Sequence, residues 1–148
     1  MKLGSHKESD LSSSRLRQLF ALAVGIAFVA VGVLGFIPWA TTDVAELPAA
    51  GPESDAYLFG IFAVSILHNV VHLAFGVAGI LMAMRAIGAR LYLVGGGIIY
   101  LALTVYGLVI DLDSEANFVP LNHADNWLHL GLGIGLMVLG LVPLRPSR

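Results

Sequence analysis

The sequence predicts an all-α integral membrane protein, a bundle of four transmembrane helices with both termini in the cytoplasm. Of its 148 residues, 57% are hydrophobic and only 12% are charged, and the mean hydropathy is +0.86. This composition lies well outside that of soluble domains. Four apolar segments are long enough to cross a hydrocarbon core of about 30 Å at about 1.5 Å per residue. We expect the spans at residues 19–38, 57–84, 91–110 and 127–144.

The first span, residues 19–38, follows a polar, serine-rich segment over residues 1–14, which we expect to be a disordered cytoplasmic tail. Its apolar run is too long for a signal peptide, and no small-residue cleavage site follows closely, so we expect it to be retained. The second span, residues 57–84, is longer than a bilayer requires and is expected to begin in the interface or to tilt. The four spans make one membrane domain over residues 15–148.

The basic residues define the orientation. All of them precede the first span, lie between the second and third, or follow the fourth: Lys2, Lys7, Arg15, Arg17, Arg85, Arg90, Arg145 and Arg148. The two opposite loops contain eight carboxylates and no lysine or arginine. By the positive-inside rule, we expect a multi-pass protein of the inner (plasma) membrane with cytoplasmic termini.

Overall composition also excludes several functions. The formal net charge is −2, and no concentrated basic surface is available to bind phosphates, which argues against a nucleic-acid partner. The absence of cysteine excludes disulfides and thiolate metal sites. The expected partner is the lipid bilayer, together with a second copy of the chain or a membrane complex; the GxxxG pair Gly131 and Gly135 is suited to such a helix contact.

A repeated motif, N-x-x-H-L-x-x-G, occurs in the second and fourth spans. Its matched residues are Asn69, His72 and Gly76 in one copy and Asn126, His129 and Gly133 in the other. Both spans run from outside to inside, so a duplication would give two parallel helical hairpins related by a pseudo-twofold axis along the membrane normal. Glycine-rich apolar helices also resemble one another by chance, and the sequence leaves the duplication open.

Four segments carry a resemblance to a known family. They read "GFIP", "YLFGIFAVSILHNVVHLAFGVAG", "ARLYLVGGGIIYLALTVYGL" and "NFVPLNHADNWLHLGLGIG". They resemble the small bacterial membrane proteins grouped as domain-of-unknown-function family 4383, over roughly residues 18–142. This resemblance implies a four-span fold and no particular activity.

Polar residues recur at steps of three and four along the spans and so share helix faces. Small and polar faces pack against one another in membranes, since polar groups avoid lipid. The candidate hydrogen-bonding residues are Ser65, Asn69, Tyr100, Asn122 and Asn126. We expect them in the outer leaflet with the histidines. The segment "NFVPLNHADNW" is expected to cover this cluster, with Asp125 or Asn126 capping the fourth span.

The histidines suggest a metal site. His68 and His72, at i and i+4, can reach one ion, with His129 as a third ligand. Asp111 or Asp125 would supply an oxygen ligand or a hydrogen bond to a ligand. Three imidazoles suit zinc or copper. A lesser alternative is haem b held between His72 and His129.

Catalysis is not expected. The stretch "HNVVH" resembles the zinc-protease motif H-E-x-x-H, but Asn69 stands where the glutamate acts as general base, and an amide cannot accept the proton. Two functions remain open. The cluster binds a metal ion or a small polar ligand such as a lipid head group or a quinone, or the protein is a non-catalytic structural or assembly subunit in which the cluster only fixes helix packing.

Overall fold

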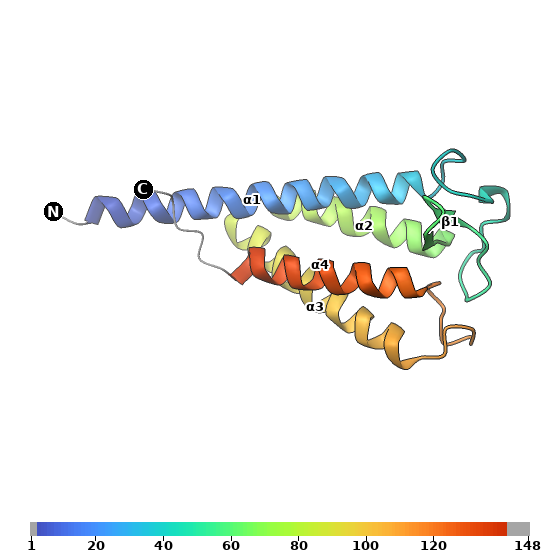
Figure 1. Ribbon diagram of the computed structural model, residues 1–148. Coiled ribbons are helices and arrows are strands. Elements are labelled where there is room, and N and C mark those ends of the chain that lie inside the picture. Colours follow the sequence, from blue (N-terminus) through green and yellow to red (C-terminus); the bar gives the residue numbers. More distant parts are fainter. Residues whose placement is uncertain (1–2, 142–148) are drawn as a thin grey trace.

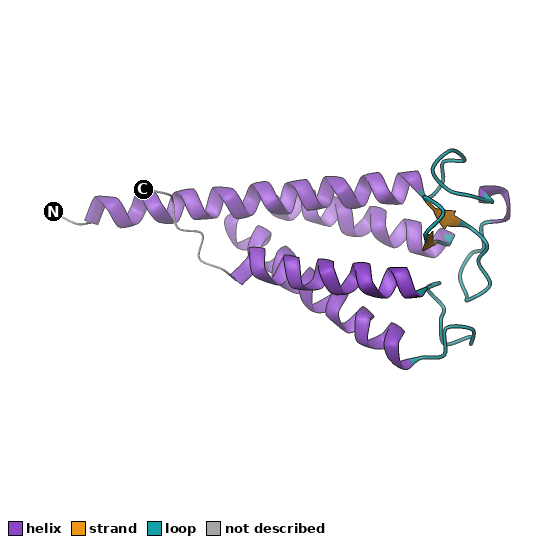
Figure 2. Ribbon diagram, in the orientation of Figure 1, coloured by secondary structure: helices purple, strands orange, loops and turns teal. Residues whose placement is uncertain are grey.

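The computed structural model describes residues 3–141, with side chains described from Ser14 onward, and this part of the chain is mostly helical (Figure 2). Its four α-helices and two short strands occur in the order α1 (Leu3–Leu34), β1 (Tyr57–Leu58), β2 (Phe62–Ala63), α2 (Ile66–Ala83), α3 (Ala86–Val109) and α4 (His123–Leu141). A 3-10 helix, η1 (Val44–Glu46), lies in the loop after α1.

All four helices are long and apolar enough to cross a membrane, which confirms the predicted four-span architecture. The apolar part of α1 is Ser14–Leu34. Residues 1–14, expected to be a disordered tail, are helical from Leu3 onward. The expected end of the fourth span at residue 144 and the two C-terminal arginines lie outside the described residues.

The second span is shorter than expected because its first residues form a β-hairpin instead of a helix. β1 pairs antiparallel with β2, with Leu58 opposite Phe62. In the turn between them Phe59 and Gly60 have φ angles of 52° and 69°. Two successive residues in the left-handed region cannot continue an α-helix, and glycine adopts that region without a Cβ penalty. Helix α2 therefore begins only at Ile66.

The helices form two antiparallel hairpins, α1 with α2 and α3 with α4, and α1 runs parallel to α3 (Figure 1). The short connection at Met84 and Arg85 joins α2 to α3 at one end of the bundle, here named the turn end. The β-hairpin and the long loops gather at the opposite end, the loop end (Figure 2). From the turn end, α2 and α3 diverge toward the loop end (Figure 1).

Equivalent contacts recur in the two hairpins. A Cβ added at Gly25 would lie 2.8 Å from the carbonyl oxygen of Gly76, and one added at Gly97 would lie 3.0 Å from that of Gly133. These glycines allow the backbones of α1 and α2, and of α3 and α4, to approach closely. At the centre, the rings of Phe28 and Tyr100, at corresponding positions of α1 and α3, stack with centroids 5.5 Å apart.

The starts of α2 and α4 also correspond. The Ser65 hydroxyl accepts a hydrogen bond from the backbone N–H of His68 at 3.1 Å. The Asn122 side chain accepts one from the N–H of Asp125 at 2.9 Å. In each hairpin, a polar side chain therefore caps the second helix by accepting a hydrogen bond from the backbone N–H three residues later. This is the N-cap arrangement.

Candidate functional site

A cavity of about 100 Å³ lies between α2 and α3, toward the loop end. Its polar lining comes from His68 and His72 on α2, Tyr100 on α3 and His129 on α4. Its apolar walls are Val71, Phe75, Ile99, Leu103, Val119 and Leu121. The three histidines predicted from the sequence to lie together therefore border one space.

The two histidines of α2 stack on each other, one helical turn apart. Their ring centroids are 4.5 Å apart and the ring planes differ by 10°. The Nδ1 atom of His72 lies 3.0 Å from the carbonyl oxygen of His68. A carbonyl only accepts, so Nδ1 carries the proton and donates it. In the neutral ring of His72 the remaining nitrogen, Nε2, then carries a lone pair and acts as an acceptor.

Aromatic rings connect the histidines of the two hairpins. The His72 ring lies 5.5 Å from that of Phe28, which stacks on Tyr100, and the Tyr100 ring lies 5.0 Å from that of His129. The pairs His72–Phe28 and His129–Tyr100 occupy corresponding places in the two hairpins. Close packing of these rings fixes the positions of the imidazoles that border the cavity.

Two ring nitrogens beside the cavity lack hydrogen-bond partners among the described residues. They are Nδ1 of His68 and Nδ1 of His129, on side chains that are only 5% and 3% exposed. A buried polar atom without a partner costs about 1–3 kcal/mol. No side chain that lines the cavity carries a fixed charge. The cavity is therefore apolar, with a few neutral hydrogen-bonding groups.

The asparagines of the repeated motif serve helix packing instead. The Nδ2 atom of Asn126 donates to the carbonyl oxygen of Gly107 at 2.9 Å, between α4 and α3. A Cβ at Gly107 would collide with the Asn126 side-chain amide, and one at Gly35 would collide with that of Asn69. Both asparagines are buried against glycine, and neither lines the cavity.

The polar residues at the helix starts are also occupied by the backbone. Asn122 caps α4, whereas the sequence predicted Asp125 or Asn126 as the cap. The Asp125 carboxylate in turn accepts a hydrogen bond from the backbone N–H of Asn122 at 3.0 Å. This reciprocal pair is a capping box. The same Asp125 oxygen accepts from the N–H of Ala63 at 3.3 Å and so joins the β-hairpin to α4.

Asp111 lies away from the histidines. Helix α3 ends at Val109, and the exposed Asp111 carboxylate accepts from the N–H of Asp113 at 3.1 Å. It borders a separate surface hollow with Asp113 and His123. Of the five predicted metal-site residues, the structure thus brings together the three histidines and leaves Asp111 and Asp125 elsewhere.

The geometry limits which cofactors fit. In the part of the chain that the structure describes, no three histidine or carboxylate side chains are grouped to hold a metal ion. The ring planes of His68 and His72 are nearly parallel, so the nitrogen lone pairs, which lie in those planes, do not converge on a common centre about 2.0–2.1 Å away, as two ligands of one zinc ion must. A cavity of about 100 Å³ is smaller than one that binds benzene, about 150 Å³, and does not admit a haem macrocycle.

Sequence reasoning missed the apolar walls of the cavity. Val71 and Phe75 are three residues from His68 and His72 respectively, and Leu103 is three from Tyr100. This helical spacing could have identified them. Val119 and Leu121 belong to the segment that we expected to cover the histidines, and they line the cavity on that side.

Comparison with known proteins identifies a family. Residues 18–142 match the model of a domain of unknown function, DUF4383. No curated protein and no solved structure matches the chain. The match covers most of the sequence and agrees with the resemblance stated above. The chain is therefore a multi-pass membrane protein that belongs to the DUF4383 family.

Proposed function

We propose that this protein is a membrane-embedded binding protein whose cavity holds one small, uncharged molecule with hydrogen-bonding groups. One observation carries the proposal: imidazoles from α2 and α4 meet on an otherwise apolar cavity, and two of them have a buried ring nitrogen without a partner. Ligand pockets commonly combine apolar walls with a small number of polar groups that orient the ligand.

The route of entry is from the lipid. Val71 on α2 and Ile99 on α3 border the cavity and are 51% and 50% exposed on the flank of two helices suited to a bilayer. Because apolar side chains on that flank face acyl chains, a ligand dissolved in the membrane reaches the cavity between these two residues. Apolar or amphipathic molecules are favoured over ions, since an unpaired ion loses too much hydration there.

A metal ion, zinc or copper, is the second candidate. It is favoured by the bond from Nδ1 of His72 to a backbone carbonyl, since histidines that bind metal usually donate their other ring nitrogen in this way. His68 and His129 would have to rotate toward the ion to complete its coordination.

A purely structural or assembly role is the remaining alternative. It is favoured by the Asn–Gly contacts, in which Asn69 and Asn126 serve helix packing. By contrast, Gly131 and Gly135 have no neighbours among the described residues within 4 Å of an added Cβ, and they are available to a second copy of the chain or another membrane subunit.

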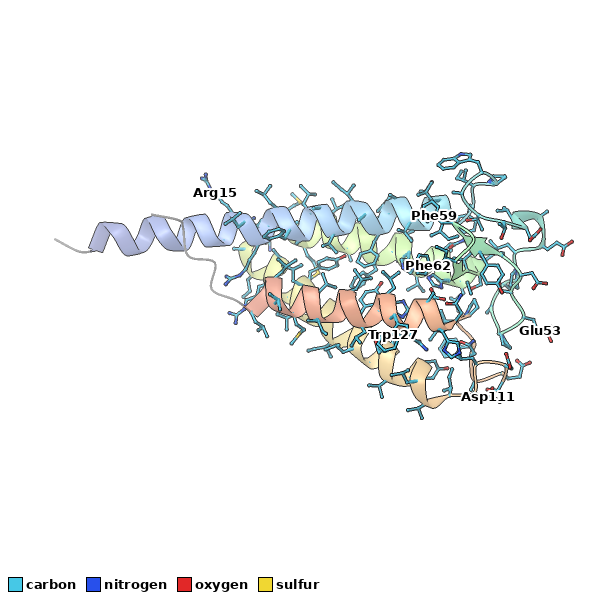
Figure 3. The ribbon with its side chains drawn as sticks, in the orientation of Figure 1. Arg15, Glu53, Phe59, Phe62, Asp111 and Trp127 are labelled. Carbon is cyan, nitrogen blue, oxygen red and sulfur yellow. The ribbon has the colours of Figure 1, made fainter. Side chains whose placement is uncertain are left out.

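We further propose the inner (plasma) membrane as the location, with the turn end cytoplasmic. Arg15 lies toward the turn end, whereas Glu53 and Asp111 lie at the loop end (Figure 3). Arg85 is part of the connection that defines the turn end. Basic residues remain on the cytoplasmic side during insertion. The cavity then opens in the outer half of the bilayer.

Occupancy of the cavity tests the binding function. The protein is transferred from its native membranes into nanodiscs, and bound molecules are identified by native mass spectrometry and metal analysis. We expect a bound species in the unaltered protein and in His123→Phe, which changes an exposed histidine outside the cavity, and its loss in His72→Phe and His129→Phe. Equal occupancy in all four proteins, or none in any, would contradict binding and favour the structural role.

A further inference from the structure

We propose that the ligand is a monocyclic aromatic alcohol, the quinol head group of a lipid-soluble carrier, whose hydroxyl donates a hydrogen bond to Nε2 of His72. This inference rests on the proposed binding function and specifies its ligand class. Size, hydrogen-bond polarity, charge and access each restrict the ligand, and together they select this class.

Size restricts the ligand to one ring. The cavity of about 100 Å³ is smaller than the cavity of about 150 Å³ that accepts benzene, so it has room for at most one six-membered ring. Its walls include the rings of Phe75 and Tyr100, whose centroids are 6.0 Å apart in an edge-to-face arrangement. Aromatic faces and edges favour a flat ring beside them. A fused two-ring head group exceeds this space.

The protonation of the His72 ring favours a ligand that donates a hydrogen bond. The Nδ1 proton of His72 is committed to the carbonyl oxygen of His68, so neutral His72 has only an acceptor to offer. A hydroxyl satisfies that acceptor, whereas the carbonyl of an oxidised quinone, which only accepts, does not. His68 and His129 border the same cavity, and the Nδ1 atom of each is buried without a partner among the described residues.

Charge and access exclude the common polar lipids. No lysine, arginine or carboxylate among the described residues lines the cavity, so the phosphate of a phospholipid would be buried without a counter-charge. Entry between Val71 and Ile99 leaves room for an apolar tail to remain among the acyl chains. An uncharged ring with a hydroxyl group and an alkyl tail meets both conditions.

The test compares three forms of one probe, a benzoquinol with a decyl tail: the quinol, its oxidised quinone, and its dimethyl ether, which has no donor. Binding of each labelled form to the protein in nanodiscs is measured at equilibrium without oxygen. We expect the quinol to bind about tenfold more tightly than the ether, the ratio produced by one good hydrogen bond. The quinone should bind more weakly than the quinol. A benzoquinol without the tail distinguishes a lipid source from a free aromatic alcohol, since a tail that partitions into the bilayer concentrates the probe beside the cavity and the tailless form should bind more weakly.

Two variants connect this preference to the cavity. His72→Phe keeps an aromatic ring beside Phe28 and removes the acceptor, and it should remove the preference for quinol over ether. Ile99→Trp fills the entrance and should abolish binding of every form, whereas His123→Phe should change nothing. Equal affinity of the unaltered protein for quinol and ether overturns the inference, and so does a preference that persists in His72→Phe. The first comparison needs no variant, so it stands even where a variant fails to fold.

The outcomes also separate the two proposals. If native membranes supply a molecule that is lost in His72→Phe, but the benzoquinol does not bind, the binding function stands and the ligand class is wrong. If no molecule occupies the cavity from either source, both are wrong.

Discussion

Replacing a buried glycine with alanine tests the repeated helix contacts. A Cβ at Gly25 would lie 2.8 Å from the carbonyl oxygen of Gly76 and 2.8 Å from the backbone nitrogen of Ile80. Its counterpart at Gly97 would lie 2.6 Å from Cγ of Met137 and 3.0 Å from both the carbonyl oxygen of Gly133 and the backbone nitrogen of Met137. Backbone atoms cannot rotate away as a side-chain end can, so each substitution forces two helices apart.

The magnitude follows from two opposing effects. Overpacking a tight interface costs typically about 1–3 kcal/mol. Alanine recovers up to about 1 kcal/mol through its higher helix propensity. With that recovery, we expect Gly25→Ala and Gly97→Ala each to lower the free energy of unfolding by up to about 2 kcal/mol. For a chain of about 150 residues this corresponds to a Tm lower by up to about 8 °C.

The matched control is Gly95→Ala on α3. A Cβ there meets nothing within 4 Å in the described structure, so only the helix propensity changes and stability should stay equal or rise. Thermal unfolding in detergent, followed by circular dichroism, measures all three variants. If Gly25→Ala and Gly97→Ala are as stable as Gly95→Ala, the close contacts within the two hairpins do not exist as described.

Three further predictions concern other parts of the molecule. Removing the cap of α4 in Asn122→Ala should cost about 1 kcal/mol in the same thermal assay, and an unchanged Tm would contradict the capping box. Asn126→Leu should lower the Tm further, because the leucine cannot donate to Gly107 and has a tetrahedral Cγ where the planar amide fits against glycine; an unchanged Tm would show that this contact is unimportant. Since the chain has no cysteine, single cysteines at Glu53 and Arg85 can be labelled with an impermeant maleimide in intact cells, and only Glu53→Cys should react; the reverse pattern would invert the proposed orientation.

Hydropathy and charge placement were sufficient to predict the four helices, because span length and hydrophobicity in a bilayer depend on local composition. The β-hairpin at Tyr57–Ala63 was not predicted. Its residues are as apolar as the helix that follows, and they differ only in backbone conformation. Gly60 was the available signal for a turn, but nothing in the sequence indicated that Phe59 would also adopt a positive φ.

The histidines that border the cavity were predicted from helical spacing. In the structure, other polar residues at the same spacing do not reach the cavity, because spacing alone does not determine which partner a side chain meets. Asn69 and His72 are three residues apart, yet the asparagine packs on Gly35 across the hairpin and the histidine borders the cavity. Asp111 is four residues after Gly107 and would share its helix face if α3 continued, but α3 ends at Val109. Which partner a polar group meets depends on tertiary packing and on where the helix ends.

An experimental structure of the protein in nanodiscs prepared directly from its native membranes tests the binding function most directly. The central claim predicts density for a small molecule between α2 and α3, with an atom within about 3.2 Å of Nε2 of His72. A cavity that contains no such density, with the imidazoles of His68 and His129 hydrogen-bonded to neighbouring helices instead, would contradict it and identify the cluster as a packing element.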